Sequence, residues 1–210
     1  MVKQALRKLS YGMYIISCKD INGKDVGCVV NTVMQITSKS PTIIVSINHD
    51  NYTNEAISKT NKFVVSILPT DIDKDIIGKF GYFSSRDINK FEGVETKELD
   101  GIKYLEKAVG VLSCSVVNTM ETETHTVFLA SVDDGKILSD KTIMTYEYYH
   151  DILKGKSPKN APTYIEDKEV ATKKVYKCQV CGYEIETDEL DEDFVCPICG
   201  VKRDRFVIKE

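Results

Sequence analysis

The chain of 210 residues contains no tryptophan and only three histidines. No stretch approaches 18 consecutive apolar residues, so we expect no transmembrane helix and no membrane partner. The first ten residues, MVKQALRKLS, lack the apolar stretch of a secretory signal peptide. The formal net charge is −4 and no long basic run is present, which argues against nucleic acid as a partner. These absences predict a cytoplasmic protein.

Several catalytic and nucleotide-binding motifs are also missing from the first 150 residues. The sequence has no HExxH, no GxSxG, no GxGxxG and no P-loop. The missing GxGxxG argues against a Rossmann domain that binds a dinucleotide. The composition, with 42% hydrophobic and 29% charged residues, is that of a globular protein.

Short β-branched and aromatic runs, separated by turn residues, fill the first 150 positions. We expect strands at 12–18, 27–34, 42–47, 63–68, 110–119 and 124–132. Helical patterns are fewer and occur at 2–9, 53–60 and 71–80. Many short strands with little helix between them predict a mainly β fold built as an antiparallel barrel rather than a parallel sheet.

The composition changes after residue 154, where lysine, proline and acidic residues replace the large aliphatic ones. We therefore predict a first domain at 1–164, a linker at 165–174 and a small second domain at 175–210. Seven acidic side chains and no basic ones lie between Cys178 and Cys199. This acidic surface is a predicted docking place for a redox partner.

The seven cysteines fall into two groups. Cys18, Cys28 and Cys114 lie in apolar runs and are expected to be small buried residues. The other four form two CxxC pairs separated by fourteen residues, namely Cys178, Cys181, Cys196 and Cys199. Two such turns brought together give tetrahedral all-thiolate coordination, which suits zinc or iron. A module of this size buries too little apolar surface to fold alone, so either metal would stabilise it.

The second domain resembles rubredoxin, on the basis of Cys181-Gly182-Tyr183 and Cys196-Pro197-x-Cys199-Gly200. An aromatic cluster of Tyr176, Tyr183, Phe194 and Phe206 is expected around the centre. The spacer of fourteen residues is shorter than in ordinary rubredoxins and looks more like the short domains at the end of rubrerythrins. Phe194 stands where rubredoxins usually carry tryptophan. The resemblance favours one iron ion, with zinc as the alternative.

Polar residues follow several predicted strands of the first domain. Asparagine, serine and threonine at such positions are more often turn formers than ligands. The stretches NTVMQIT (31–37), PTIIVSIN (41–48), NYTNE (51–55), FGYFSSRDINKF (80–91), THTVF (124–128) and APTY (161–164) nevertheless resemble the flavin reductase family. Members are split barrels that bind FMN and use NAD(P)H. Relatives often have Ser-Gly-Arg where this chain has Ser84-Ser85-Arg86.

The resemblance implies a set of FMN contacts. Residues near the flavin ring or ribityl chain would be Asn31, Thr32, Gln35 and Thr37, with backbone contacts from Ser46 and Ile47. Residues near the ribityl phosphate would be Asn48, His49 and Thr53, with Ser84, Ser85, Arg86 and Lys90 neutralising the phosphate. A helix beginning near Thr53 would add free N–H groups that favour an anion.

His125 has two interpretations. A strand histidine is commonly a hydrogen-bonded core residue. The family resemblance instead places it beside the flavin on the nicotinamide-facing side, where it would position the substrate or stabilise negative charge on reduced flavin. It is not expected to be an essential acid or base, because hydride transfer depends on orientation more than on proton transfer.

Taken together, the two domains resemble the high-molecular-weight rubredoxins, which are NAD(P)H-dependent flavin reductases with a C-terminal rubredoxin. The resemblance implies an oxidoreductase that passes electrons from NAD(P)H through FMN and iron to a redox protein such as a flavodiiron protein. It also implies a homodimer with FMN at the interface. Two alternatives stay open: an electron-carrier flavoprotein without NAD(P)H activity, and a zinc-stapled binding module on a degenerate barrel.

Overall fold

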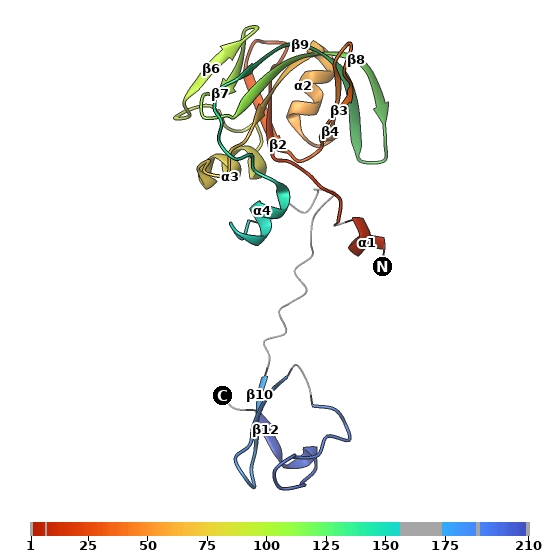
Figure 1. Cartoon of the computed structure of the whole chain (residues 1–210), viewed down its shortest axis with the longest axis vertical. Helices are drawn as coiled ribbons and strands as arrows, with labels where there is room; N and C mark the ends of the chain where they lie inside the picture. Colours follow the sequence, from red (N-terminus) through yellow and green to blue (C-terminus); the bar gives the residue numbers. More distant parts are fainter. Residues whose placement is uncertain (1, 7, 156–173, 188–189, 209–210) are drawn as a thin grey trace. The chain divides into compact units, whose positions relative to one another are not determined.

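The structure is a computed structural model that describes residues 2–6, 8–155, 174–187 and 190–208. The chain divides into two compact units, 1–164 and 165–210, which are described separately (Figure 1). The predicted linker at 165–174 lies outside the described residues except for Lys174, where the first strand of the second unit begins. The APTY stretch at 161–164 is also outside them. No described helix is long and apolar enough to cross a membrane.

The larger unit consists mainly of strands. Its helices are α1 (Val2–Leu6), α2 (Tyr52–Thr60), α3 (Lys74–Tyr82) and α4 (Tyr146–Asp151). Its strands are β1 (Tyr14–Lys19), β2 (Asp25–Val30), β3 (Val33–Thr37), β4 (Thr42–Asn48), β5 (Lys62–Ile67), β6 (Thr96–Leu99), β7 (Ile102–Leu105), β8 (Gly110–Glu121) and β9 (His125–Ile137). The predicted mainly β fold is therefore confirmed.

Seven of these strands form one antiparallel sheet in the order β2-β1-β5-β8-β9-β4-β3. The sheet curls around α2, which lies inside it (Figure 1). One predicted strand, 27–34, is wrong as a single element: it breaks at Asn31–Thr32 into β2 and β3, which lie at opposite ends of the strand order. The separate hairpin β6–β7 was not predicted from the sequence.

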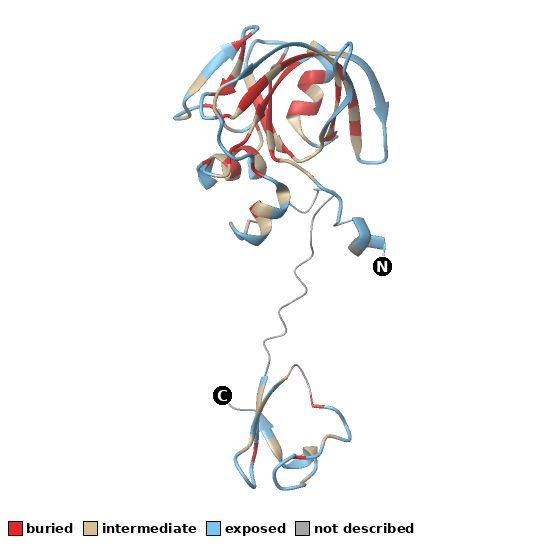
Figure 2. Cartoon of the chain, viewed as in Figure 1, coloured by how far each residue is buried: buried red, intermediate tan, exposed pale blue. Residues whose placement is uncertain are grey.

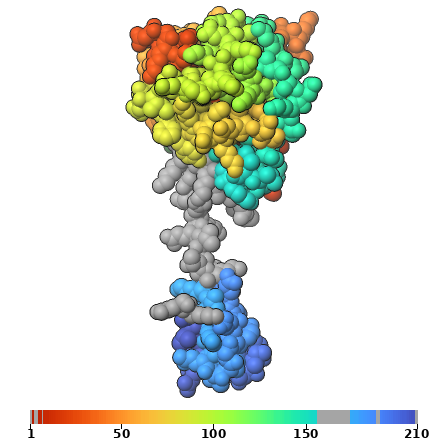
Figure 3. Space-filling model, turned by 90° about the vertical axis from the view of Figure 1, so that its left-hand side faces the viewer, coloured from red at the N-terminus to blue at the C-terminus, as the bar shows by residue number. Residues whose placement is uncertain are grey.

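The middle of the sheet is buried on both faces because alternate residues of a strand point to opposite sides. On β1, Ile16 joins the cluster inside the curled sheet with Phe63 and Phe128, whereas Ile15 joins a second cluster outside it with Phe80. Residues of α3, the β6–β7 hairpin and α4 cover that outer cluster. In the space-filling view of Figure 3, these segments form much of the visible surface of the larger unit. This double burial explains the near-continuous apolar pattern of β1 and β5.

Helix α2 begins at an Asn51 cap, whose side-chain oxygen accepts a hydrogen bond from the Thr53 N–H at 3.0 Å. It ends at Asn61, which adopts the left-handed conformation with φ of 56°. Ala56 and Ile57 are buried and belong to the apolar cluster inside the sheet. Figure 2 shows buried stretches of α2 within the curled sheet. The helix therefore fills the interior of the barrel while its N-terminus follows directly from the end of β4.

The smaller unit contains a three-stranded sheet in the order β11-β10-β12. The elements are β10 (Lys174–Cys178), β11 (Glu184–Thr187), a 3-10 turn η1 (Arg203–Arg205) and β12 (Phe206–Ile208). The rings of Phe194 and Phe206 meet edge to face with their centroids 5.3 Å apart, so part of the predicted aromatic cluster is present. Among the described residues of this unit only Cys178, Leu190 and Cys196 are buried.

The packing of α2 predicts the effect of truncating its buried face. Ile57→Ala should lower the free energy of unfolding by about 2–5 kcal/mol, because the lost methylene contacts leave a cavity inside the barrel. Ser58→Ala, on the exposed side of the same helix, should change it by less than about 0.5 kcal/mol. Urea unfolding of the two variants measures the difference, and equal values would contradict the proposed interior position of α2.

Candidate functional site

Four sulfur atoms meet at one end of the smaller unit. The Sγ atoms of Cys178, Cys181, Cys196 and Cys199 all lie within 4.8 Å of one another. The distance is 3.8 Å from Cys178 to Cys199 and 3.5 Å from Cys181 to Cys196. A tetrahedral ion with metal–sulfur bonds of about 2.3 Å separates its sulfurs by about 3.8 Å. The four predicted ligands therefore fit one tetrahedral metal ion.

The two CxxC turns have the same local construction. The N–H of Gly182 donates to the Cys178 carbonyl and that of Gly200 donates to the Cys196 carbonyl, both at 2.9 Å. Both glycines have positive φ values, 77° and 71°, which a residue with a Cβ adopts only with strain. Each glycine thus allows its turn to close beneath the metal ligands.

Backbone N–H groups point at the sulfurs. Burial alone would raise the pKa of the Cys178 thiol, but N–H groups of Cys181 and Val180 donate to its sulfur and bring the pKa to about 7. Burial likewise opposes ionisation of Cys196, yet N–H groups of Cys199 and Ile198 donate to that sulfur and lower its pKa. For Cys181 and Cys199 the N–H groups of Tyr183 and Val201 donate as well, but burial and hydrogen bonds with the other sulfurs outweigh them and raise the pKa instead. The turns of the metal-free chain therefore favour the thiolate form at the first cysteine of each pair.

A cluster of charged and aromatic side chains around Arg86 lies at the N-terminal turn of α2 in the larger unit. The Arg86 guanidinium lies 4.7 Å from the centre of the Tyr52 ring and donates to the Glu55 carboxylate at 2.6 Å. The Tyr52 hydroxyl donates to Asp20 at 2.8 Å. Arg86 and the first turn of α2, which are far apart in the sequence, therefore meet on one surface, as a site for a phosphate would require.

Two of the residues predicted to neutralise phosphate are buried instead of exposed. Lys90 is 2% exposed, and its ammonium donates to the carbonyls of Gly27 at 2.8 Å and Phe80 at 3.1 Å. The Ser85 side chain is also 2% exposed, and its hydroxyl bonds to the backbone of Gly27. Ser84 is half-buried and its hydroxyl accepts from the Arg86 N–H at 3.1 Å.

Another group of predicted residues shares the outer face of β4 and β9. Asn48 pairs with His125 and Ser46 pairs with Val127, and paired residues of antiparallel strands project from the same side of the sheet. All four are half-buried. Asn31 and Thr32 occupy the β2–β3 connection, where the Thr32 carbonyl accepts from the Ser46 N–H at 3.3 Å. Five predicted site residues are thus gathered near one end of these strands: four expected near the ring or ribityl chain, and Asn48, which was expected near the ribityl phosphate.

Four other predicted residues make different contacts. Gln35 and Thr37 lie toward the β3–β4 turn, where Thr37 bonds to Ser40 and Thr42. The side chain of Ile47 is buried and its carbonyl accepts from the Asn54 amide. Thr53 is fully buried, and its hydroxyl has no hydrogen-bond partner among the described residues. The structure therefore separates the side chains of Gln35, Thr37 and Thr53 from the surface around His125 and Arg86. The contact expected of Ile47 was with its backbone, and that expectation stays a prediction.

His125 and His49 lie close to each other at the end of β4. The His49 imidazole bonds to Glu121 at 2.9 Å, and the same carboxylate accepts from Thr126 at 3.0 Å. The Thr124 hydroxyl lies 2.7 Å from Nδ1 of His125. Desolvation by burial, together with the charge of His49, lowers the pKa of His125 below its ordinary value. Its surroundings consequently favour the neutral form of His125 over the imidazolium.

Tyr52, Glu55 and Glu121 also belong to these clusters, although they were not predicted as site residues. Tyr52 and Glu55 lie inside the NYTNE stretch, so that stretch already contained the signal. Glu121 is different, because its contact with His49 spans 72 positions of the sequence and depends on the β8–β9 pairing. Only the strand register reveals it.

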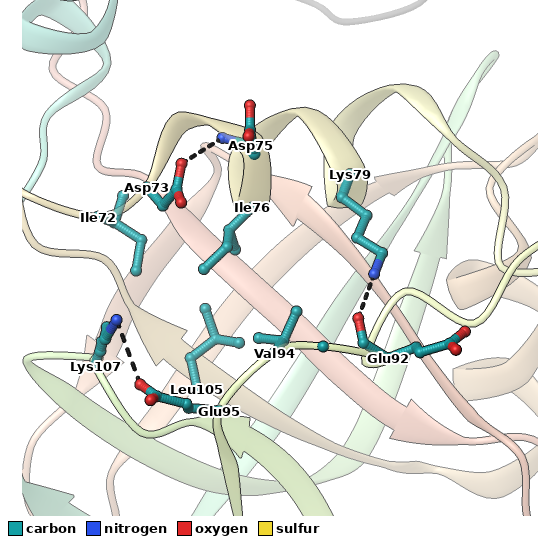
Figure 4. Close-up of a pocket in the computed structure, with 11 residues that line it drawn as sticks. Ile72, Asp73, Asp75, Ile76, Lys79, Glu92, Val94, Glu95, Leu105 and Lys107 are labelled. Carbon is teal, nitrogen blue, oxygen red and sulfur yellow. Dashed lines mark hydrogen bonds and ion pairs between the residues drawn. The ribbon is translucent and has the colours of Figure 1, made fainter.

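A cavity of about 350 Å³ lies between α3 and residues 92–95 (Figure 4). Its floor is apolar, from Ile72, Ile76, Val94 and Leu105. The charged groups on its rim bond to one another or to nearby backbone: Lys107 pairs with Glu95 at 3.3 Å, and Lys79 donates to the Glu92 carbonyl at 2.5 Å. None of the predicted flavin residues lines this cavity, so it is separate from the site described above.

The pKa of His125 supplies a direct test of the His125–His49 arrangement. His49→Asn should raise the pKa of His125, because the like charge is removed while desolvation stays. In the wild-type chain the folded-state pKa lies below the unfolded value of about 6.5, so protonation of His125 destabilises the fold as the pH falls. NMR titration of the three histidines measures this, and His150→Asn should leave His125 unchanged. An unchanged pKa of His125 in His49→Asn would contradict the arrangement.

Comparisons with known proteins match both units of the chain. Residues 6–155 match the family described as "Flavin reductase like domain", and residues 176–207 match "Rubrerythrin, rubredoxin-like domain". The high molecular weight rubredoxin of Moorella thermoacetica is 37% identical, over 98% of this chain and 99% of its own length. The ferric-chelate reductase (NAD(P)H) of Archaeoglobus fulgidus is 38% identical, over 79% of this chain and 98% of its own length.

Among solved structures, the NADH:FAD oxidoreductase SgcE6 of Streptomyces globisporus has the same fold, with a TM-score of 0.62 at 17% identity over 69% of this chain and 86% of its own. The four-sulfur geometry, the curled sheet around α2 and these matches lead to one conclusion. The chain belongs to the flavin reductase-like family and carries a C-terminal rubredoxin-like domain.

Proposed function

We propose that the chain is an NAD(P)H-dependent FMN oxidoreductase that passes electrons to an iron ion held by its four cysteines. An external redox protein, such as a flavodiiron protein, would then accept them. The observation that carries the proposal is the presence of a four-thiolate site on the same chain as a flavin reductase-like unit. A bound flavin accepts a hydride as an electron pair and releases electrons singly, and a four-thiolate iron carries one electron.

The exposure of the metal site supports iron rather than structural zinc. Cys181 and Cys199 are exposed, as are the neighbouring Val180 and Ile198, which are 60% and 69% exposed. Exposed ligands bring the metal close to the surface, where a partner protein can exchange electrons with it. A zinc ion that only stabilises the fold needs no such exposure. Exposed acidic residues of this unit, including Glu184, Glu186 and Asp191, would favour a partner with a basic surface.

In the larger unit, the described contacts support the phosphate of FMN near Arg86. The guanidinium is held in place by Tyr52 and Glu55, and its planar donors suit a phosphate. The N-terminal turn of α2 favours negative charge at the same surface. Ser46, Asn48 and His125 would contact the ring from the outer face of β4 and β9. A neutral His125 would position the nicotinamide through hydrogen bonds and would not act as an acid.

We also propose a homodimer. The same outer face that carries Asn48 and His125 continues into apolar rows, because Met34 pairs with Ile44 and Ile44 pairs with Leu129. Met34 and Ile36 are 59% and 49% exposed. An exposed apolar face of this kind is typical of a protein interface. A second copy placed there would border the predicted ring contacts and exclude water from them.

Adding charge to this face should prevent association. Met34→Lys is expected to convert a dimer into a monomer, because the ammonium would be desolvated in the interface. Sedimentation velocity measures the change, and Ile21→Lys, on the exposed β1–β2 turn, serves as a matched control. A monomeric wild-type chain, or a dimeric Met34→Lys, would contradict the assignment of this face.

Removal of the arginine contact tests the phosphate site. Arg86→Ala should weaken FMN binding by about 1–3 kcal/mol, the scale of a hydrogen bond to a charged group. Binding of riboflavin, which has no phosphate, should be unchanged. Fluorescence titration of both flavins measures the two affinities, and an unaltered FMN affinity would remove Arg86 from the site.

The proposed order of electron transfer predicts that the iron site can be removed without loss of flavin reduction. Cys196→Ser should lose iron but keep FMN reduction by NADH, because the ligands and the flavin contacts belong to different units. Metal analysis and anaerobic mixing with NADH measure the two properties. Loss of flavin reduction in Cys196→Ser would contradict the independence of the two units. If neither NADH nor NADPH reduces the flavin of the wild-type chain, the reductase function is contradicted.

A further inference from the structure

The ammonium of Lys90 lies in the interior of the larger unit. Its side chain is 2% exposed and its two hydrogen bonds go to backbone carbonyls, those of Gly27 and Phe80. Desolvation by burial lowers its pKa. A buried ammonium is costly unless its donors are satisfied in a fixed geometry. Lys90 is thus held on two segments, β2 and the end of α3, and does not present its charge to solvent.

Gly27 is the point where the loop that carries Arg86 is attached. Among the described strands, β2 is at the end of the strand order, so one of its edges has no partner in that part of the chain. The Gly27 N–H donates to the Ser85 hydroxyl, which in turn donates to the Gly27 carbonyl, both at 3.2 Å. The same carbonyl accepts from Lys90 at 2.8 Å. Side chains of the 84–90 loop therefore cover the backbone groups of this edge.

The close packing around Gly27 depends on the absence of a side chain at this position. A Cβ there would lie 2.9 Å from the Ile16 carbonyl oxygen, 3.1 Å from the Phe80 ring and 3.2 Å from the Phe91 ring. The rings of Phe80 and Phe91 meet edge to face with centroids 5.0 Å apart. The attachment point is consequently packed on all these sides and has little room to move.

In the sequence, Arg86 lies between Ser85 and Lys90, the two residues whose side chains bond to Gly27. The Lys24 ammonium adds a further bond to the Ser85 carbonyl. With both sides of the loop fixed, the guanidinium extends to the ring of Tyr52 and the carboxylate of Glu55 on α2. The orientation of Arg86 thus depends on contacts at Gly27 that Arg86 does not itself make.

We propose that Lys90 is a positioning residue that fixes the 84–90 loop on Gly27 and so places Arg86 for the phosphate of FMN. Lys90 does not contact the phosphate. This inference rests on the proposed FMN-binding function. It replaces the direct phosphate contact that the family resemblance implied for Lys90 with an action through Arg86.

A double-mutant cycle on the full-length chain tests this inference. FMN and riboflavin affinities are measured by fluorescence titration for the wild type, Lys90→Met, Arg86→Ala and the double variant. We expect Lys90→Met to weaken FMN binding about tenfold, the scale of a charge-assisted hydrogen bond, and to leave riboflavin binding within about twofold. Because Lys90 acts through Arg86, the double variant should bind FMN no more than about threefold more weakly than Arg86→Ala.

Three results would overturn the inference. One is a double variant whose FMN affinity falls by the product of the two single-variant factors, which would indicate a direct contact of Lys90 with the phosphate. Another is an equal loss of riboflavin and FMN binding in Lys90→Met, which indicates general disruption of the fold. The third is unchanged FMN binding in that variant. The exposed Lys97→Met on β6 is the matched control and should bind both flavins normally.

A milder variant keeps the inference testable if Lys90→Met does not fold. Ser85→Ala removes one attachment to Gly27 and leaves the buried ammonium in place. It should weaken FMN binding about threefold without affecting riboflavin, and unchanged FMN binding would overturn the inference. Failure of the wild-type chain to bind FMN would contradict the proposed function itself, whereas normal wild-type binding with unaffected variants contradicts only the role of Lys90.

Discussion

The burial of α2 inside the curled sheet is the interaction on which the larger unit depends. Ile57 and Ala56 fill the interior between strands that are distant in the sequence, and the sheet closes around them. Only three residues, 49–51, separate the end of β4 from the start of this helix. Its position therefore brings the first turn of α2, the outer face of β4 and the loop that carries Arg86 to one region. A single packing arrangement both stabilises the barrel and assembles the proposed site.

The smaller unit depends on a different constraint. Its described residues bury little apolar surface, and two of the three buried apolar side chains belong to metal ligands, Cys178 and Cys196. Metal binding and folding are therefore coupled in this unit. The backbone N–H groups that face the sulfurs serve both purposes, because they fix the turns and stabilise thiolate charge. In the proposed function, the exposed ligands would give the metal a route to an external partner.

The sequence predicted what depends on local patterns. The two CxxC pairs and their glycines predicted the metal ligands in full, because each turn is complete within a few residues. The strand patterns predicted the mainly β fold. The break at Asn31–Thr32 was missed, since an unbroken apolar run does not show where the chain leaves one sheet edge for the other. The hairpin β6–β7 was missed because its short strands have little apolar alternation.

The direction in which each side chain points was harder to predict from the sequence than the fold. Lys90 and Ser85 stand in a polar segment next to Arg86, and the sequence gives them the same chemistry. Only the tertiary structure shows that their partners are the backbone groups of Gly27, about 60 positions away along the chain. The contact of Glu121 with His49 is likewise a product of strand register. Pairing between distant segments determines where these side chains lie, and local sequence patterns do not record such pairing.

The most direct test of the account is the order in which the two centres become reduced in the wild-type chain. Rapid anaerobic mixing with NADH or NADPH would follow the flavin band and the ferric-thiolate band of the same sample. The account predicts that both bands bleach and that bleaching of the ferric band requires the flavin. Bleaching of the ferric band in flavin-free protein, or a chain with no ferric-thiolate band when supplied with iron, would contradict it.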